Sequence, residues 1–144
     1  MDFQATIFPG TRAAGLIIGD FLPDTPPDHQ RSVELSNVEF RELTYGSVTI
    51  LSSDKRIVEI ALREGYKGKT EKGIGIGSTI QEVIEAYGED VQEDWEENLI
   101  TPSTPGWCFE TTVWETPYDP NSRIIYIVVY SIDRGKLTKY EDAN

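Results

Sequence analysis

The sequence predicts an α+β domain, in which an antiparallel sheet of roughly four to six strands carries one helix on one face. The helix is predicted over Thr79–Tyr87, because apolar residues recur there at the spacing of one helical face. A β-hairpin is predicted where Tyr45–Leu51 and Arg56–Leu62 alternate apolar and polar residues around a polar turn. Arg123–Ser131 is the most strand-like stretch of the chain.

Local signals define both ends of the predicted helix. Ser78 is expected to cap its start, and Gln81, three residues later, would complete a capping box. Gly88 stands where a residue in the left-handed helical conformation commonly ends a helix. Before the cap, Gly73–Gly77 alternates glycine with isoleucine, so the chain is expected to enter the helix in an extended conformation.

The remaining elements are predicted from local composition and from the positions of prolines. Residues 23–32 contain three prolines and are expected to form a loop. Val33–Leu43 is compatible with either a strand or a short helix. An acidic run follows the predicted helix, and Trp107–Trp114 is rich in aromatic and β-branched residues, which favours a strand.

The two halves of the chain share an order of elements. Gly15–Asp20 echoes Gly73–Ser78, with glycines enclosing an isoleucine-rich stretch and a capping side chain at the end. In each half, two predicted strands joined by a polar turn come next. We therefore expect one domain over residues 1–144, built from approximate half repeats at 10–65 and 68–132.

This order resembles a known repeating unit. A glycine-isoleucine entry, a short capped helix ending in Tyr87-Gly88 and a strand hairpin are similar to the unit of beta-lactamase-inhibitor-protein-like domains and of small outer-membrane-assembly lipoproteins. Similar short units also occur in other bacterial proteins. The resemblance covers Lys72–Tyr130 well, and Gly15–Leu62 in its entry and hairpin. It implies a helix-and-sheet scaffold that binds proteins rather than one that catalyses a reaction.

Composition limits the classes of function. The chain has 144 residues, enough for one domain with its own core, and a formal net charge of −12. That charge argues against binding to nucleic acid or to an anionic membrane surface. It permits a basic partner protein, and it equally serves solubility. No signal peptide or membrane-spanning run is recognised, so a cytoplasmic protein is expected.

Few residues indicate enzymatic chemistry. The single cysteine, Cys108, and the single histidine, His29, are far apart in sequence, and Cys108 falls within a predicted strand where a buried thiol is usual. We therefore expect no nucleophilic catalysis, no metal site and no cofactor. Glu110 and Glu115, with nearby tryptophans, leave a carboxylate-based sugar hydrolase as a minor alternative.

A second minor alternative is an anion site at the glycine-rich entry. Gly73–Gly77 precedes a helix N-terminus, and Lys67, Lys69 and Lys72 lie close to it in sequence. The spacing matches neither a dinucleotide fingerprint nor a phosphate-binding P-loop. The structural interpretation is that the glycines allow a tight turn while the isoleucines reach the core.

The sequence therefore predicts a non-enzymatic acidic binding protein, most concretely an inhibitor or immunity-type protein that neutralises a partner. A small structural or assembly module is the alternative, and a carboxylate-based hydrolase is the third possibility. Acidic and aromatic residues of the second half are the candidates for contact with the partner, with a tryptophan as anchor. They are Glu93, Asp94, Trp95, Glu96, Glu97, Glu110 and Trp114.

Overall fold

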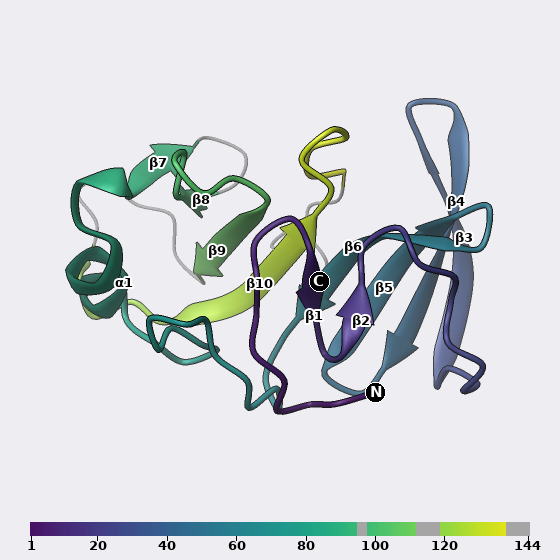
Figure 1. Ribbon diagram of the computed structural model, residues 1–144, viewed down its shortest axis with the longest axis horizontal. Helices are drawn as coiled ribbons and strands as arrows, with labels where there is room; N and C mark the ends of the chain where they lie inside the picture. Colours follow the sequence, from purple (N-terminus) through teal and green to yellow (C-terminus); the bar gives the residue numbers. More distant parts are fainter. Residues whose placement is uncertain (95–97, 112–118, 138–144) are drawn as a thin grey trace.

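The computed structural model describes residues 1–94, 98–111 and 119–137. They form an eight-stranded antiparallel sheet, a separate two-stranded ribbon and one short α-helix (Figure 1). The α+β class is confirmed, and the sheet has more strands than the four to six expected. The elements are β1 (Arg12–Ala13), β2 (Leu16–Ile17), β3 (His29–Leu35), β4 (Val38–Tyr45), β5 (Val48–Ser53), β6 (Arg56–Leu62), α1 (Ile80–Tyr87), a 3₁₀ turn (Gly88–Asp90), β7 (Gln92–Asp94), β8 (Asn98–Ile100), β9 (Trp107–Thr111) and β10 (Ile124–Tyr130).

The sheet consists of two antiparallel meanders that meet at their last strands. Its order is β3-β4-β5-β6-β10-β9-β8-β7. The central pairing joins β6 to β10, with Leu62 opposite Ile127 and Glu59 opposite Tyr130. Consequently the end of β6 lies beside the beginning of β10, although about sixty residues separate the two strands.

The hydrophobic core lies between one face of this sheet and two covering elements. Ile80 and Val83 of α1 are buried in it, and Tyr87 contacts Trp107 edge-on with 5.9 Å between ring centroids. The N-terminal segment, residues 2–20 with β1 and β2, crosses the same face (Figure 1). Ile7, at the start of that segment, is completely buried.

The N-terminal segment is tied to the chain that precedes α1. Tyr66 accepts a hydrogen bond from the Ala14 amide (2.9 Å) and donates one to the Ala5 carbonyl (2.6 Å). Burial raises the pKa of the Tyr66 hydroxyl, and the hydrogen bond from Ala14 opposes that rise. The Ile7 amide donates to the Lys69 carbonyl at 3.0 Å. These bonds fix the N-terminal segment against residues 66–70.

The helix begins one residue later than the sequence suggested. Thr79, not Ser78, is the N-cap, and Glu82, not Gln81, completes the capping box. Ser78 instead accepts a hydrogen bond from the Gly75 amide at 3.0 Å, so its hydroxyl stabilises the entry loop. The one-residue offset arises because both Ser78-x-x-Gln81 and Thr79-x-x-Glu82 satisfy the capping-box pattern.

The structure decides one open expectation about strands and corrects another. Val33–Leu43 is the β3–β4 hairpin, whose two turn residues, Ser36 and Asn37, have positive φ. Because β3 starts at His29, the expected loop over residues 23–32 ends earlier. Part of the acidic run forms β7.

The two halves repeat one set of hydrogen bonds. The Gly19 amide donates to the Ile57 carbonyl (2.8 Å), as the Gly77 amide does to the Ile124 carbonyl (2.8 Å). Arg56 Nη1 donates to the Gly19 carbonyl (2.9 Å), and Arg123 Nη1 donates to the Gly77 carbonyl (2.7 Å). Each glycine-rich entry is thus bound to the last strand of its own meander in the same way.

Within the ranges that the structure describes, no helix has both the length and the apolar character needed to cross a membrane.

Candidate functional site

Five acidic residues, two of them predicted to meet a partner, lie at one end of the sheet. Glu85, Glu89 and Glu93 are exposed, and Asp90 and Asp94 are half-buried. We call these five residues the acidic end. They span the last turn of α1, the 3₁₀ turn and β7, which is the last strand in the sheet order.

No lysine or arginine interrupts the sequence from Glu85 to Asp94. Ile84, on the exposed side of α1 beside these carboxylates, keeps 41% of its surface accessible. The acidic end therefore combines a single sign of charge with one apolar side chain. Of the predicted contact residues, the structure places Glu93 and Asp94 here. Trp95, Glu96, Glu97 and Trp114 lie outside the described residues.

Glu110 does not belong to this surface. Its side chain is fully buried, and Lys136, itself almost fully buried, forms an ion pair with it. Alternation along β9 directs Glu110 to the same face as Cys108, which is also buried. The segment around Lys136 packs over that face, and the Leu137 amide donates to the buried carboxylate of Glu59. The prediction of Glu110 as a surface contact is therefore not supported.

The helix N-terminus is also closed to a ligand. The amides of Ile80 and Gln81 donate to the carbonyls of Ser122 (2.9 Å) and Pro120 (3.0 Å). The Glu82 amide donates to the Thr79 hydroxyl at 3.1 Å. Since these donors already have acceptors, they cannot cradle a phosphate without breaking the cap.

A groove of about 580 Å³ lies beside the glycine-rich entry. Its walls are residues 63–69, residues 75–77 and residues 123–126, so it forms where the end of β6 meets the beginning of β10. Four basic side chains line it, Arg63, Lys67, Lys69 and Arg123, against the single carboxylate of Glu64. All five of these charged residues are exposed. We call this feature the cationic groove.

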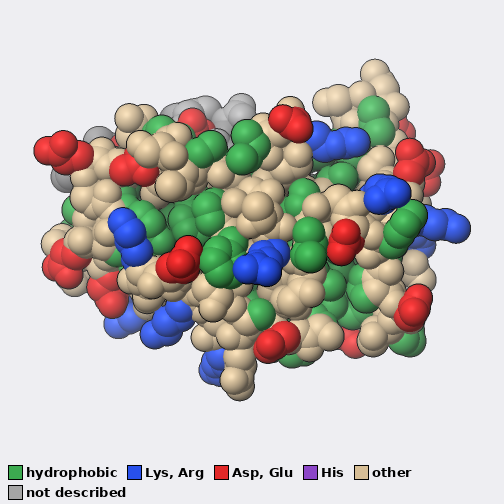
Figure 2. All heavy atoms as spheres, viewed as in Figure 1, with side chains coloured by type: hydrophobic (Ala, Val, Ile, Leu, Met, Phe, Trp, Pro, Cys, Tyr) green, Lys and Arg blue, Asp and Glu red, His purple; other side chains and the backbone are tan. Residues whose placement is uncertain are grey.

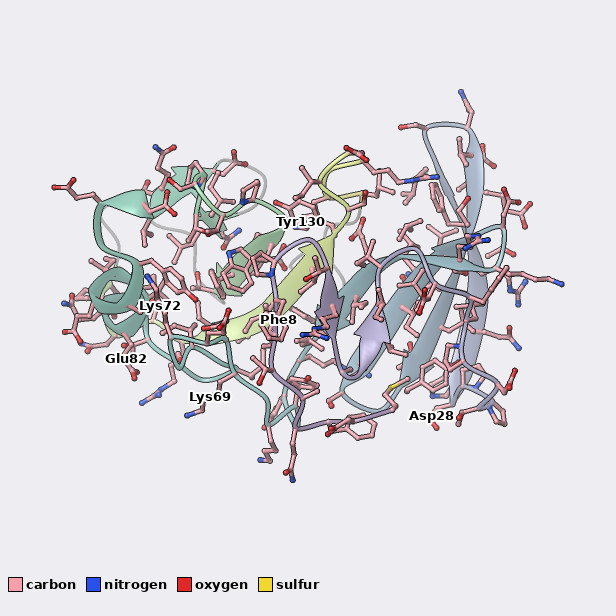
Figure 3. All side chains as sticks on the ribbon, viewed as in Figure 1. Phe8, Asp28, Lys69, Lys72, Glu82 and Tyr130 are labelled. Carbon is pink, nitrogen blue, oxygen red and sulfur yellow. The ribbon has the colours of Figure 1, made fainter. Side chains whose placement is uncertain are left out.

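Basic side chains also gather on one part of the face that Figure 2 shows. Figure 2 shows basic side chains gathered at the lower left of the face, near the start of β10. Lys69 is labelled in that area, on the same side as Glu82 (Figure 3). The hydrogen bonds from the Thr79 amide and hydroxyl lower the pKa of Glu82, and the charges of Arg123 and Lys69 lower it further. Arg123 and Lys69, from different segments of the groove lining, therefore act on one carboxylate.

Sequence reasoning found only part of this groove. It noted Lys67 and Lys69 near the glycine-rich entry, but it did not connect them with Arg63 or Arg123. Each arginine stands just outside a strand, after β6 or before β10. Knowledge that β6 and β10 are antiparallel neighbours would have brought the two arginines together, and no local pattern provides that pairing.

In comparisons with protein-family models, curated proteins and solved structures, nothing matches this chain. The resemblance to beta-lactamase-inhibitor-protein-like units therefore remains a prediction from the sequence. Within residues 1–94, 98–111 and 119–137, no group of three His, Cys, Asp or Glu side chains is arranged to hold a metal ion.

Proposed function

We propose that this protein is a non-enzymatic binding protein whose acidic end recognises a basic surface of a partner protein. The observation that carries the proposal is the continuous acidic end itself, where five carboxylates occur over ten residues without a basic residue among them. Repulsion among these charges disfavours the folded chain on its own, and a cationic partner removes that repulsion. Complementary charge would accelerate and orient the encounter.

Two further features support this choice of surface. Ile84 offers an apolar contact next to the carboxylates, which is the arrangement of an anchor within a polar rim. β7 is the outermost strand on its side of the sheet, so an extended segment of a partner can pair with its outer edge. A partner strand that carries lysine or arginine would hydrogen-bond to the backbone of β7 and pair its charges with the carboxylates.

We favour an inhibitor or immunity-type role, in which binding blocks a basic functional surface of the partner. A structural or assembly module would use the same surface without blocking activity. We also infer that the half repeats 10–65 and 68–132 derive from one unit, and the matching bonds of Gly19 with Ile57 and of Gly77 with Ile124 support this inference. Such a scaffold presents surface rather than a catalytic cleft.

Charge reversal tests the acidic end. Glu89→Lys combined with Glu93→Lys is compared with Glu34→Lys combined with Glu39→Lys, which makes the same change in net charge on the β3–β4 hairpin. Each protein is used to capture partners from an extract of the source cells, and the association rate is measured at several salt concentrations. We expect the first variant to lose the partner that the wild type and the second variant retain.

The salt response gives the second readout. Wild-type association should slow as ionic strength rises, because surface charges are screened over about 8–10 Å near physiological salt. The Glu89/Glu93 variant should lose that dependence. If both variants capture the same partner at the wild-type rate, the acidic end is a solvated surface and the proposal is wrong.

A further inference from the structure

We propose that the cationic groove is a binding site for a small organic anion with an aromatic body. The site is separate from the acidic end, because the groove borders the N-terminal end of α1 and the acidic end follows its C-terminal end. The groove's volume of about 580 Å³ falls within the range of small-molecule sites.

Charge is the first argument. The chain as a whole carries −12, whereas the groove gathers four basic side chains and one acidic side chain, a local balance of +3 (four minus one). Two separate segments, residues 63–69 and residues 123–126, supply these cations to one concavity. An anion placed there meets positive charge from both of these segments, so the site favours a carboxylate or sulfonate over a neutral ligand.

Preorganisation is the second argument. Arg63 donates from Nε and Nη2 to the Gly46 carbonyl (3.2 and 2.9 Å). Arg123 donates from Nη1 to the Gly77 carbonyl (2.7 Å). A guanidinium has five N–H donors, so the bond to Gly77, which lines the groove, holds Arg123 at the groove wall and leaves further N–H groups outside that bond. Arg63 is held at Gly46, in the β4–β5 turn outside the groove lining. Less side-chain entropy is then lost when an anion binds.

The lining supplies an apolar surface as well as charge. Ile76, Ile125 and Tyr126 line the groove and are half-buried, whereas Tyr66 and Ile124 are buried beneath it. An inorganic anion would leave this surface in water. A ligand with a hydrophobic body would cover it and gain the corresponding free energy of burial.

The first half of the molecule indicates that the body is aromatic. Arg56, which bonds to Gly19 as Arg123 bonds to Gly77, lies over the Phe21 ring with its guanidinium carbon 4.1 Å from the ring centroid. Phe21 is two residues after Gly19, and the residue two after Gly77 is Thr79, whose side chain caps α1. Among the described residues, no aromatic ring stacks on Arg123. An aromatic ligand can therefore make with Arg123 the contact that Phe21 makes with Arg56.

The test uses three probes on the full chain. 2-Naphthoate has the ring and the charge, 2-naphthylmethanol has the ring alone, and sulfate has the charge alone. Binding is followed by amide NMR shifts and by calorimetry. We expect 2-naphthoate to bind more tightly than either of the others and to shift the amides of Gly65, Gly68, Gly75 and Gly77. Equal binding of the neutral probe, equal binding of sulfate, or no binding of 2-naphthoate would each overturn the proposal.

Variants locate the site and separate charge from fold. The double variant Lys67→Gln with Lys69→Gln should lower the affinity for 2-naphthoate roughly tenfold or more, which is the effect of losing a charge-assisted contact. Lys55→Asn combined with Arg134→Gln, at two exposed positions outside the groove lining, removes the same two charges and is the control for net charge. Arg123→Gln is paired with Arg56→Gln, the same change at the matching hydrogen bond of the other half. Melting temperatures check folding, and affinity that is unchanged by the groove variants would refute the assignment.

Discussion

At the residue scale, Glu82 shows how one side chain joins two structural roles. Its carboxylate accepts hydrogen bonds from the Thr79 amide (3.0 Å) and the Thr79 hydroxyl (3.1 Å), which completes the helix cap. The same carboxylate interacts electrostatically with Arg123 and Lys69 of the cationic groove. Both influences favour the ionised form in the folded state.

The lowered pKa of Glu82 predicts an acid-sensitive cap. Because the folded-state pKa is lower than the unfolded-state pKa, the stabilisation is complete above the usual glutamate value of about 4.3 and is lost as pH falls through the folded pKa. Glu82→Gln should therefore have a lower melting temperature than the wild type at pH 7, and the difference between the two melting temperatures should decrease at acidic pH. Thermal melts across pH 2–7, as a rough range around that value, measure the difference.

Glu85→Gln is the control for this experiment, because it removes a carboxylate one turn away and leaves the capping box intact. A difference between wild type and Glu82→Gln that stays constant from neutral to acidic pH would show that the ionised cap does not contribute.

At the element scale, α1 depends on its termini because it has only eight residues. Its C-cap, Gly88, has φ 58° and ψ −132°. Sequence reasoning predicted the positive φ correctly, but this ψ differs from the left-handed helical region that usually ends a helix. The pair of angles is one that glycine alone adopts readily.

We therefore expect Gly88→Ala and Gly88→Asn to destabilise the protein to similar extents, by about 1–3 kcal/mol. No atom lies within 4 Å of a Cβ built on Gly88, so the cost would come from the backbone rather than from a clash. Asparagine adopts the left-handed helical conformation more readily than most residues. It should give no advantage over alanine at position 88, because the ψ of Gly88 lies outside that region. Urea unfolding measures both variants, and wild-type stability of Gly88→Asn would contradict the argument.

The elements that sequence reasoning predicted well are those with a strong local pattern. α1 and the β5–β6 hairpin have such patterns, and both are present. Val33–Leu43 remained open between strand and helix because its decisive feature is the pair of positive-φ residues Ser36 and Asn37, which Gly would signal more clearly. The burial of Glu110 could not be foreseen, because the lysine that pairs with it comes from residue 136.

At the scale of the whole molecule, the N-terminal segment joins the parts of the fold. It bonds to Ile57 of the first meander through Gly19. Its Gly10 amide donates to the Gly106 carbonyl (3.0 Å), just before β9 of the second meander. The cationic groove depends on the same long-range assembly, since its walls come from segments about sixty residues apart. Such sites are the least accessible to sequence reasoning.

Close packing at Gly68 predicts how this assembly can be disrupted. A Cβ at Gly68 would lie 2.0 Å from the Ala5 carbonyl oxygen and 2.6 Å from Cε2 of Tyr66. Gly68→Ala should therefore displace the N-terminal segment and cost about 1–3 kcal/mol or more. Hydrogen exchange of the Ile7 amide, which donates to Lys69, should become faster.

Gly73→Ala is the comparison for Gly68→Ala, because Gly73 has positive φ (85°) and no neighbour within 4 Å of its Cβ position. It should cost stability through backbone strain without releasing the N-terminal segment. Slow exchange of Ile7 in Gly68→Ala would show that the segment is not held by this close approach.

The tie between Gly10 and Gly106 sets an order of events during synthesis on the ribosome. Gly10 is translated 96 residues before its partner (106 minus 10), so at roughly 5–20 residues per second the wait is about 5–20 s. The strands of the first meander contact their sequence neighbours and have been made by Leu62. The segment that holds Gly10 therefore completes its contacts after the first meander can form, and a nascent chain that ends before Gly106 lacks the bond that joins this segment to the second meander.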